Sequence, residues 1–147
     1  MSEPIMVAVP AEAGERFRPP TSPASEPFWE ATRERRLVVQ WCLHCERPIH
    51  FPREACPACL GTDLEFRVAS GRATVYAVSV MPKAANPTMA GRGPYAVALV
   101  QLDEGVRLLT NVITADPYAV LVGDAVTVAW EPLTDGRHLP VFVPQAR

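Results

Sequence analysis

Short runs of β-branched and other apolar residues, separated by turn residues, fill the chain from residue 64 onward. In the stretch AVTVAW, Val126, Val128 and Trp130 alternate with smaller residues, which is the period of a strand with one face in a core. Similar runs recur with no helical pattern between them. The pattern therefore predicts a mainly β fold, with a small antiparallel barrel of about five or six strands over residues 64–147.

Two segments of different character stand at the amino end of the chain. Residues 1–26 contain five prolines and no lasting helical or strand period, which predicts a flexible, proline-rich arm. Residues 27–37 are predicted to form a short helix in which Phe28 and Trp29 anchor one face. Ser25 stands where its hydroxyl would cap the first turn of that helix.

Length and charge narrow the class of protein. A chain of 147 residues with 48% hydrophobic content suits one compact domain, or a small domain with a satellite. The net charge of −2 and the pI of about 5.9 give no broad basic field, which argues against nucleic acid or an anionic membrane as a partner. The sequence has neither a basic, apolar leader nor a run of 18 apolar residues, so we expect a cytoplasmic protein.

All four cysteines fall between residues 38 and 63, as two C-x-x-C pairs with ten residues between them. Thiols stay reduced in the cytoplasm, so a metal site is favoured over disulfides. Two such turns facing each other form a tetrahedral cage of four sulfurs, which suits Zn²⁺ and leaves no open position for a catalytic water. A ribbon this small lacks a core of its own, and a structural zinc supplies ~10–16 kcal/mol of folding free energy. The predicted ligands are Cys42, Cys45, Cys56 and Cys59.

Alternative chemistry for this segment stays open. His44 and His50 could compete as ligands, and iron also accepts a four-thiolate cage, as in a rubredoxin-type electron carrier. Elsewhere no spacing of Ser, His and Asp indicates a catalytic triad, and neither a P-loop nor G-x-G-x-x-G occurs. The sequence therefore predicts no active site.

Seven segments follow one another between about residues 27 and 144: PFW, RLVVQWCLHC, FPREACPAC, SGRATVYAVSV, GPYAVALVQLDEGVRLLTNV, LVGDAVTVAW and LPVFVP. In this order they resemble the zinc-ribbon plus OB-fold family of acyl-CoA-associated proteins, formerly a domain of unknown function. The resemblance implies a helix, a rubredoxin-like zinc ribbon over residues 38–63 and a five-stranded OB-fold barrel, with the four cysteines as metal ligands. The chain departs from such ribbons at Glu46, where glycine is frequent, and at Gly61, which comes one place late.

The resemblance also implies a function, that of a non-catalytic accessory subunit of a thiolase-like enzyme in lipid metabolism. Partners of the family include thiolases, hydroxymethylglutaryl-CoA synthase assemblies and aldolases that cleave acyl-CoA side chains in steroid degradation. The accessory chain joins its partner in a hetero-oligomer and helps form the acyl-CoA channel, a task that suits a rigid barrel with an apolar groove. The sequence leaves open the acyl-CoA, the kind of partner enzyme and the stoichiometry.

Two sets of residues are candidates for these contacts. Lys83 and Arg92 lie in the loop KAANPTMAGRGP and could contact CoA phosphates, with a merely solvated loop as the alternative. Large apolar residues of the helix and ribbon are candidate partner contacts, since such residues anchor interfaces. Their alternative role is to pack the ribbon against the barrel. They are Phe28, Trp29, Ile49 and Phe51.

A single-stranded nucleic-acid binder is the alternative function, because zinc ribbons and OB barrels both do such work. Grooves of that kind combine basic residues with exposed aromatics on which bases stack. The predicted barrel offers few aromatics, chiefly Tyr76, Tyr95, Trp130 and Phe142, and the chain is net negative. We therefore prefer the accessory role.

Overall fold

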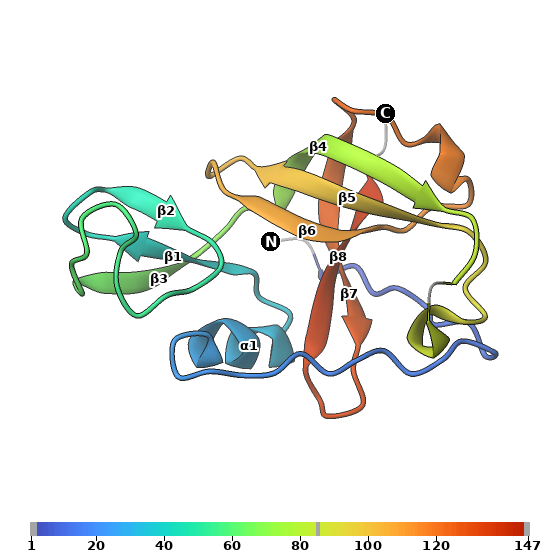
Figure 1. The fold of residues 1–147 in the computed structure, drawn as a ribbon, viewed down its shortest axis with the longest axis horizontal. Helices are drawn as coiled ribbons and strands as arrows, with labels where there is room; N and C mark the ends of the chain where they lie inside the picture. The colour runs from blue at the N-terminus through green and yellow to red at the C-terminus, as the bar shows by residue number, and fades with distance from the viewer. Residues whose placement is uncertain (1–2, 85, 146–147) are drawn as a thin grey trace.

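The computed structural model describes residues 3–84 and 86–145, and it places a three-stranded sheet beside a closed five-stranded barrel (Figure 1). Within these residues one α-helix, α1 (Glu26–Arg33), lies where the two meet and contacts strands of both. No helix in residues 3–84 and 86–145 has the length and apolar character needed to cross a membrane. The mainly β fold class is confirmed.

The sheet consists of β1 (Val38–Cys42), β2 (Arg47–Ile49) and β3 (Leu64–Val68), and the barrel of β4 (Arg72–Met81), β5 (Tyr95–Leu102), β6 (Arg107–Val112), β7 (Ala125–Pro132) and β8 (His138–Pro144). Two short 3-10 turns, η1 (Pro87–Met89) and η2 (Pro117–Ala119), lie in the loops that precede β5 and β7.

The helix begins where the sequence predicted but is capped differently. Ser25 is the N-cap residue, yet its hydroxyl accepts a hydrogen bond from Ser22 N–H at 3.0 Å and none from the helix. Phe28 and Trp29 are buried, as expected of the anchoring face. The helix is fixed to the protein mainly by that face.

The helix ends at Arg33, short of the predicted boundary at residue 37. Arg35 adopts a left-handed conformation with φ 56°, and its N–H donates to Thr32 O at 3.0 Å. Arg36 N–H donates to Ala31 O at 3.1 Å. These two bonds form a Schellman motif that stops the helix, with arginine in the position that glycine usually takes.

The three-stranded sheet includes a strand that the sequence assigned to the barrel. Its order is β2-β1-β3, and β1 pairs with β3 from Val38↔Val68 to Cys42↔Leu64. The barrel begins only with β4, after Gly71, whose φ of +83° turns the chain. The prediction of a barrel over residues 64–147 was therefore wrong at its start, because an alternating strand does not reveal which sheet it joins.

The barrel has the strand order β4-β5-β6-β8-β7 and closes through antiparallel pairing of β4 with β7. Between β6 and β8 the strands run parallel and pair at Val112↔Phe142. A β-bulge in β4, between Val75 and Ala77, helps the long strand bend around the barrel. This topology is the OB fold.

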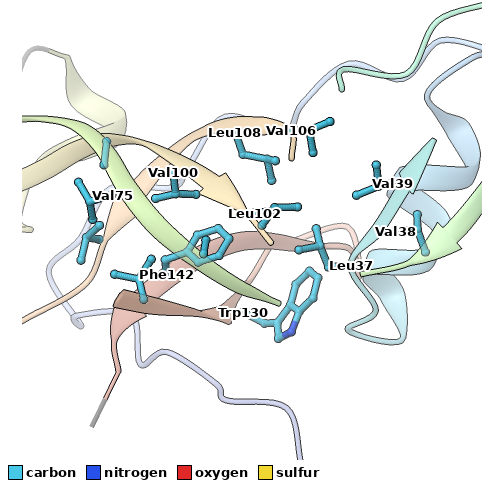
Figure 2. Packing of buried hydrophobic residues seen from close by; sticks show 14 of the residues in the cluster. Leu37, Val38, Val39, Val75, Val100, Leu102, Val106, Leu108, Trp130 and Phe142 are labelled. Carbon is cyan, nitrogen blue, oxygen red and sulfur yellow. The ribbon is translucent and has the colours of Figure 1, made fainter. Parts of the chain in front are cut away.

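The main core fills the barrel and extends to the root of the ribbon. Figure 2 shows Trp130 and Phe142 inside the barrel, with Leu37 packing beside Trp130. Val126 and Trp130 are buried as the alternation in AVTVAW predicted, whereas Val128 is only partly buried. The ribbon and the barrel therefore share one hydrophobic cluster.

The described part of the proline-rich arm, residues 3–25, lies against the barrel. Trp130 N–H donates to Ile5 O at 2.8 Å, and Val7 N–H donates to Trp130 O at 2.9 Å. Further along, Gly14 N–H donates to Ala90 O at 2.8 Å, so the arm also holds the loop before β5. The prediction of a flexible arm was therefore wrong for these residues. The sequence could not show the docking, because backbone pairing of this kind depends on partners distant in the chain.

Candidate metal centre and docking surface

The four cysteines meet at one end of the three-stranded sheet. Cys42 ends β1, Cys45 lies in the turn before β2, and Cys56 and Cys59 lie in a second turn before β3. Their Sγ atoms all lie within 4.8 Å of one another, with Cys42 to Cys59 at 3.7 Å and Cys45 to Cys56 at 3.9 Å. A tetrahedral zinc with ~2.3 Å bonds to sulfur requires sulfur–sulfur separations of about 3.8 Å. The four residues therefore fit a structural Zn²⁺.

Backbone amides support three of the four sulfurs. Cys45 N–H donates to Cys42 Sγ, Ala58 N–H to Cys56 Sγ and Gly61 N–H to Cys59 Sγ, each at 3.4 Å. Hydrogen bonds of this kind favour the charged thiolate, which is the form that binds metal. Zinc held here would serve the fold, since four protein ligands complete its coordination.

The two metal-binding turns keep their shape without glycine at the critical positions. Glu46 and Leu60 each directly follow the second cysteine of a pair, and both adopt left-handed backbone, with φ of 54° and 63°. The departures at Glu46 and Gly61 therefore leave the ligand cage intact. The strain of two L-residues with positive φ is carried by the metal-binding turns.

The neighbouring thiols and backbone amides shift the pKa values of two cysteines. Hydrogen bonding to Cys59, together with burial, raises the pKa of Cys45 to about 12. Backbone hydrogen bonds from Cys59 and Ala58 lower the pKa of Cys56 to about 7. Four neighbouring thiols thus cannot all ionise readily near neutral pH by themselves. A bound divalent cation would stabilise the thiolates and allow all four to ionise.

Neither histidine near the cysteines joins the metal cage. His44 is exposed, and the His50 ring packs 5.6 Å from Phe28. In the residues that the structure describes, the four cysteines form the only group of three or more potential ligands close enough to share a metal. His138 is likewise structural, since its Nδ1 lies 2.9 Å from Thr32 O at the joint between α1 and β8.

The predicted partner contacts are mostly buried. Phe28 and Trp29 pack edge to face with ring centroids 4.9 Å apart, and Ile49 belongs to the small core around the cysteines. Only Phe51 is exposed, at 42%. The alternative role weighed for these residues, packing of helix and ribbon, therefore accounts for Phe28, Trp29 and Ile49.

A groove of about 420 Å³ lies between the ribbon and the barrel. Phe51 lines it from the ribbon side, and Leu109, which is 73% exposed on β6, lines it from the barrel side. The sequence did not single out Leu109, although the alternation in VRLLTNVI places it on the face opposite the buried Leu108. The remaining wall is formed by Phe28, Trp29, His50, Leu99, Arg107, Leu108, Leu139 and Pro140.

The two candidate CoA-phosphate residues differ in environment. Lys83 is exposed, and its role stays a prediction. Arg92 is largely buried, and its Nη1 lies 3.1 Å from Glu131 Oε1. Its guanidinium is therefore already paired with a carboxylate, as is that of Arg16, which the sequence did not indicate.

Two of the four barrel aromatics named from the sequence are closed to stacking bases. Trp130 and Phe142 are buried in the core. Tyr76 is 49% exposed, and the guanidinium of Arg107 stacks on its ring, 3.7 Å from the centroid. The burial of Trp130 and Phe142 leaves few aromatics for stacking, which weighs against the nucleic-acid alternative.

A four-cysteine ribbon followed by a five-stranded OB barrel defines a zinc-ribbon OB-fold protein. Models of the ChsH2 family match its two parts: the rubredoxin-like zinc ribbon domain matches residues 29–65, and the C-terminal OB-fold domain matches residues 66–131. The chain belongs to this ChsH2 (DUF35) family, which confirms the resemblance seen in the sequence.

Several relatives are informative. The chain is 35% identical to a chain of the solved "Ltp2-ChsH2(DUF35) aldolase", with a TM-score of 0.78 over 86% of this chain and 98% of that one. It is 33% identical to a "DUF35 domain-containing scaffold protein" of Methanocaldococcus jannaschii, covering 65% of this chain and 68% of the relative. A "Probable enoyl-CoA hydratase alpha subunit" of Thermomonospora curvata is 38% identical over 80% of this chain. The match spans only 36% of that hydratase subunit's length.

Proposed function

We propose that this chain is a non-catalytic accessory subunit that binds a thiolase-like enzyme, such as an acyl-CoA aldolase or a thiolase, and helps form its acyl-CoA channel. The observation that carries the proposal is the match over 98% of a chain of the solved "Ltp2-ChsH2(DUF35) aldolase", whose name joins a DUF35 protein to Ltp2 in one aldolase. The proposed setting is cytoplasmic lipid or steroid side-chain degradation, as the family resemblance implies.

The chemistry of the chain supports a non-catalytic role. The four thiols that could bind metal form a closed cage, so a zinc bound there has no position for substrate or water. The scaffold name of the methanogen relative agrees with this role, whereas the hydratase name belongs to a subunit of which the match covers only 36%. Catalysis is therefore assigned to the partner.

The proposed docking surface is the groove between ribbon and barrel. It is apolar and concave, and Phe51 and Leu109 stand exposed at its two sides. Large apolar residues in such a position can anchor a partner. Lys83, exposed in the loop between β4 and β5, is the proposed contact for CoA phosphate.

The test is reconstitution with thiolase-like enzymes from the same source. The zinc-loaded chain should have no acyl-CoA-transforming activity alone, should co-elute with one such enzyme in size-exclusion chromatography, and should raise its activity or solubility. Leu109→Asp should weaken the complex at least about tenfold, because a charge would be desolvated in the interface. Leu121→Asp, at a residue 64% exposed in the loop before β7, is the matched control and should bind like the parent.

A parallel titration with oligo-dT tests the alternative function, single-stranded nucleic-acid binding. Micromolar oligonucleotide binding without any thiolase-like partner would overturn the accessory role. A complex that tolerates Leu109→Asp but not Leu121→Asp would leave the accessory role standing and move the docking surface to the loop before β7.

A further inference from the structure

Three charged side chains meet in the interior on the side of the barrel covered by the arm. Arg16 comes from the arm, Arg92 from the loop before β5 and Glu131 from β7. Arg16 Nε lies 2.5 Å from Glu131 Oε2, and Arg92 Nη1 lies 3.1 Å from Oε1. The three side chains are 11%, 9% and 2% exposed. Two buried cations thus share one carboxylate.

Some of the remaining guanidinium donors have weak partners or none. Arg16 Nη2 donates to Asn111 Oδ1 at 3.0 Å, but its Nη1 faces only the Met89 sulfur at 3.6 Å. Arg92 Nη2 donates to Gly14 O at 3.3 Å, and Arg92 Nε is buried with no hydrogen-bond partner. A buried charge or donor left uncompensated is costly, so this cluster favours a further acceptor.

Glu15, another acid close to the cluster, does not supply that acceptor. Glu15 lines a neighbouring cavity with both arginines and Glu131, yet it is exposed and accepts a hydrogen bond from Thr134 Oγ1 at 2.7 Å. The buried cluster keeps an excess of one positive charge.

A cavity of about 110 Å³ opens beside the two arginines and Glu131. Asn111, Tyr95 and Thr114 add polar atoms to its wall. The rest of the wall is mostly apolar, with contributions from Val7, Pro10, Met89, Pro94, Val112 and Ile113. None of the residues that line the docking groove lines this cavity.

We propose that this cavity binds a short-chain monocarboxylate, with its carboxylate on the guanidinium groups of Arg92 and Arg16 that line the cavity and its alkyl chain against the apolar wall. A monoanion matches the single excess charge, whereas the dianionic phosphates of CoA would be repelled by Glu131 and the nucleotide would not fit the volume. The ligand would fix the arm to the barrel, because Arg16 belongs to the arm and Arg92 to the loop beneath it.

The experiment compares butyrate, inorganic phosphate and chloride at equal ionic strength on the zinc-loaded full chain. At ten times its Kd, butyrate should raise the Tm by about 4–5 °C over chloride. Isothermal titration should give one site, and the guanidinium resonances of Arg92 should shift on binding.

Three variants test the location. Arg92→Gln should abolish the butyrate-dependent gain in Tm, whereas Arg67→Gln, which removes an exposed charge on β3, should retain it. Thr114→Leu keeps both arginines and narrows the cavity, so it should weaken butyrate binding at least about tenfold even if Arg92→Gln folds poorly. The proposal is overturned by no gain over chloride, by binding of phosphate but not butyrate, or by butyrate binding unchanged in Thr114→Leu.

Discussion

The buried side-chain amide of Gln40 forms two hydrogen bonds with the backbone of Arg53. Gln40 Nε2 donates to Arg53 O and Arg53 N–H donates to Gln40 Oε1, both at 2.8 Å. Gln40 lies at the centre of β1, and Arg53 lies in the loop that carries the chain to the second pair of cysteines. A side chain thus takes the place of a strand partner and holds this loop against the sheet.

Replacing Gln40 with leucine should lower the free energy of unfolding by about 1–2 kcal/mol, because both backbone groups of Arg53 lose their partner. Gln101→Leu is the matched control, since Gln101 is exposed and accepts one hydrogen bond from Arg107. It should cost less than about 0.5 kcal/mol. Urea midpoints measured with zinc present compare the two, and equal losses would show that the Gln40 amide is not a structural link.

The purified chain should contain one zinc, and Cys45→Ala should lose it. The ribbon core around Cys42, Cys56 and Ile49 is small, so hydrogen exchange in β1 and β2 should become fast without metal. The strands of the barrel should stay protected, because most of the shared hydrophobic cluster lies in the barrel. Elemental analysis with hydrogen-exchange mass spectrometry tests this, and less than half a zinc per chain in protein purified without chelators would contradict it.

Trp130→Ala should destabilise the protein by about 3–5 kcal/mol, because it opens a large cavity in the barrel core. The side chain is among the largest of those fully buried, and Phe142 and Leu37 lie near it in Figure 2. Leu109→Ala should change stability by less than about 0.5 kcal/mol, since Leu109 is exposed. Similar urea midpoints for the two variants would contradict the inward orientation of Trp130.

The sequence predicted those features that depend on local pattern. Cysteine spacing identified the ligand set, because a C-x-x-C turn needs no distant information to place two sulfurs together. Alternation in AVTVAW identified Trp130 as a core residue, since the strand period itself separates the two faces. Fold class and metal followed from these two signals.

Features set by distant partners could not be predicted. The strand Leu64–Val68 has the same alternation as a barrel strand, and only its pairing with β1 assigns it to the ribbon. The burial of Arg16 against Glu131 could not be predicted, because the two residues lie 115 positions apart in the chain. The sequence predicted a docking surface or internal packing for Phe28 and Trp29 with equal weight, and their burial favours packing.

Stability should depend on pH through His50. Burial lowers the pKa of this histidine from 6.5 to about 4, and its ring packs against Phe28 and Phe51. Between these values the unfolded chain binds the proton more tightly, so the free energy of unfolding falls as the pH falls from about 6.5 towards 4. The loss from this residue should be about 2 kcal/mol at pH 5 and negligible above pH 7.5.

His50→Gln separates this effect from protonation of the zinc ligands, which weakens metal binding in both proteins alike. The variant lacks the titrating ring. On lowering the pH from 7.5 to 5, the parent should therefore lose about 2 kcal/mol more unfolding free energy than the variant. Urea unfolding at saturating zinc gives that difference, and an NMR titration gives the pKa of the ring directly. Parallel pH profiles, or a ring that titrates near 6.5, would mean that His50 is solvated in the folded protein.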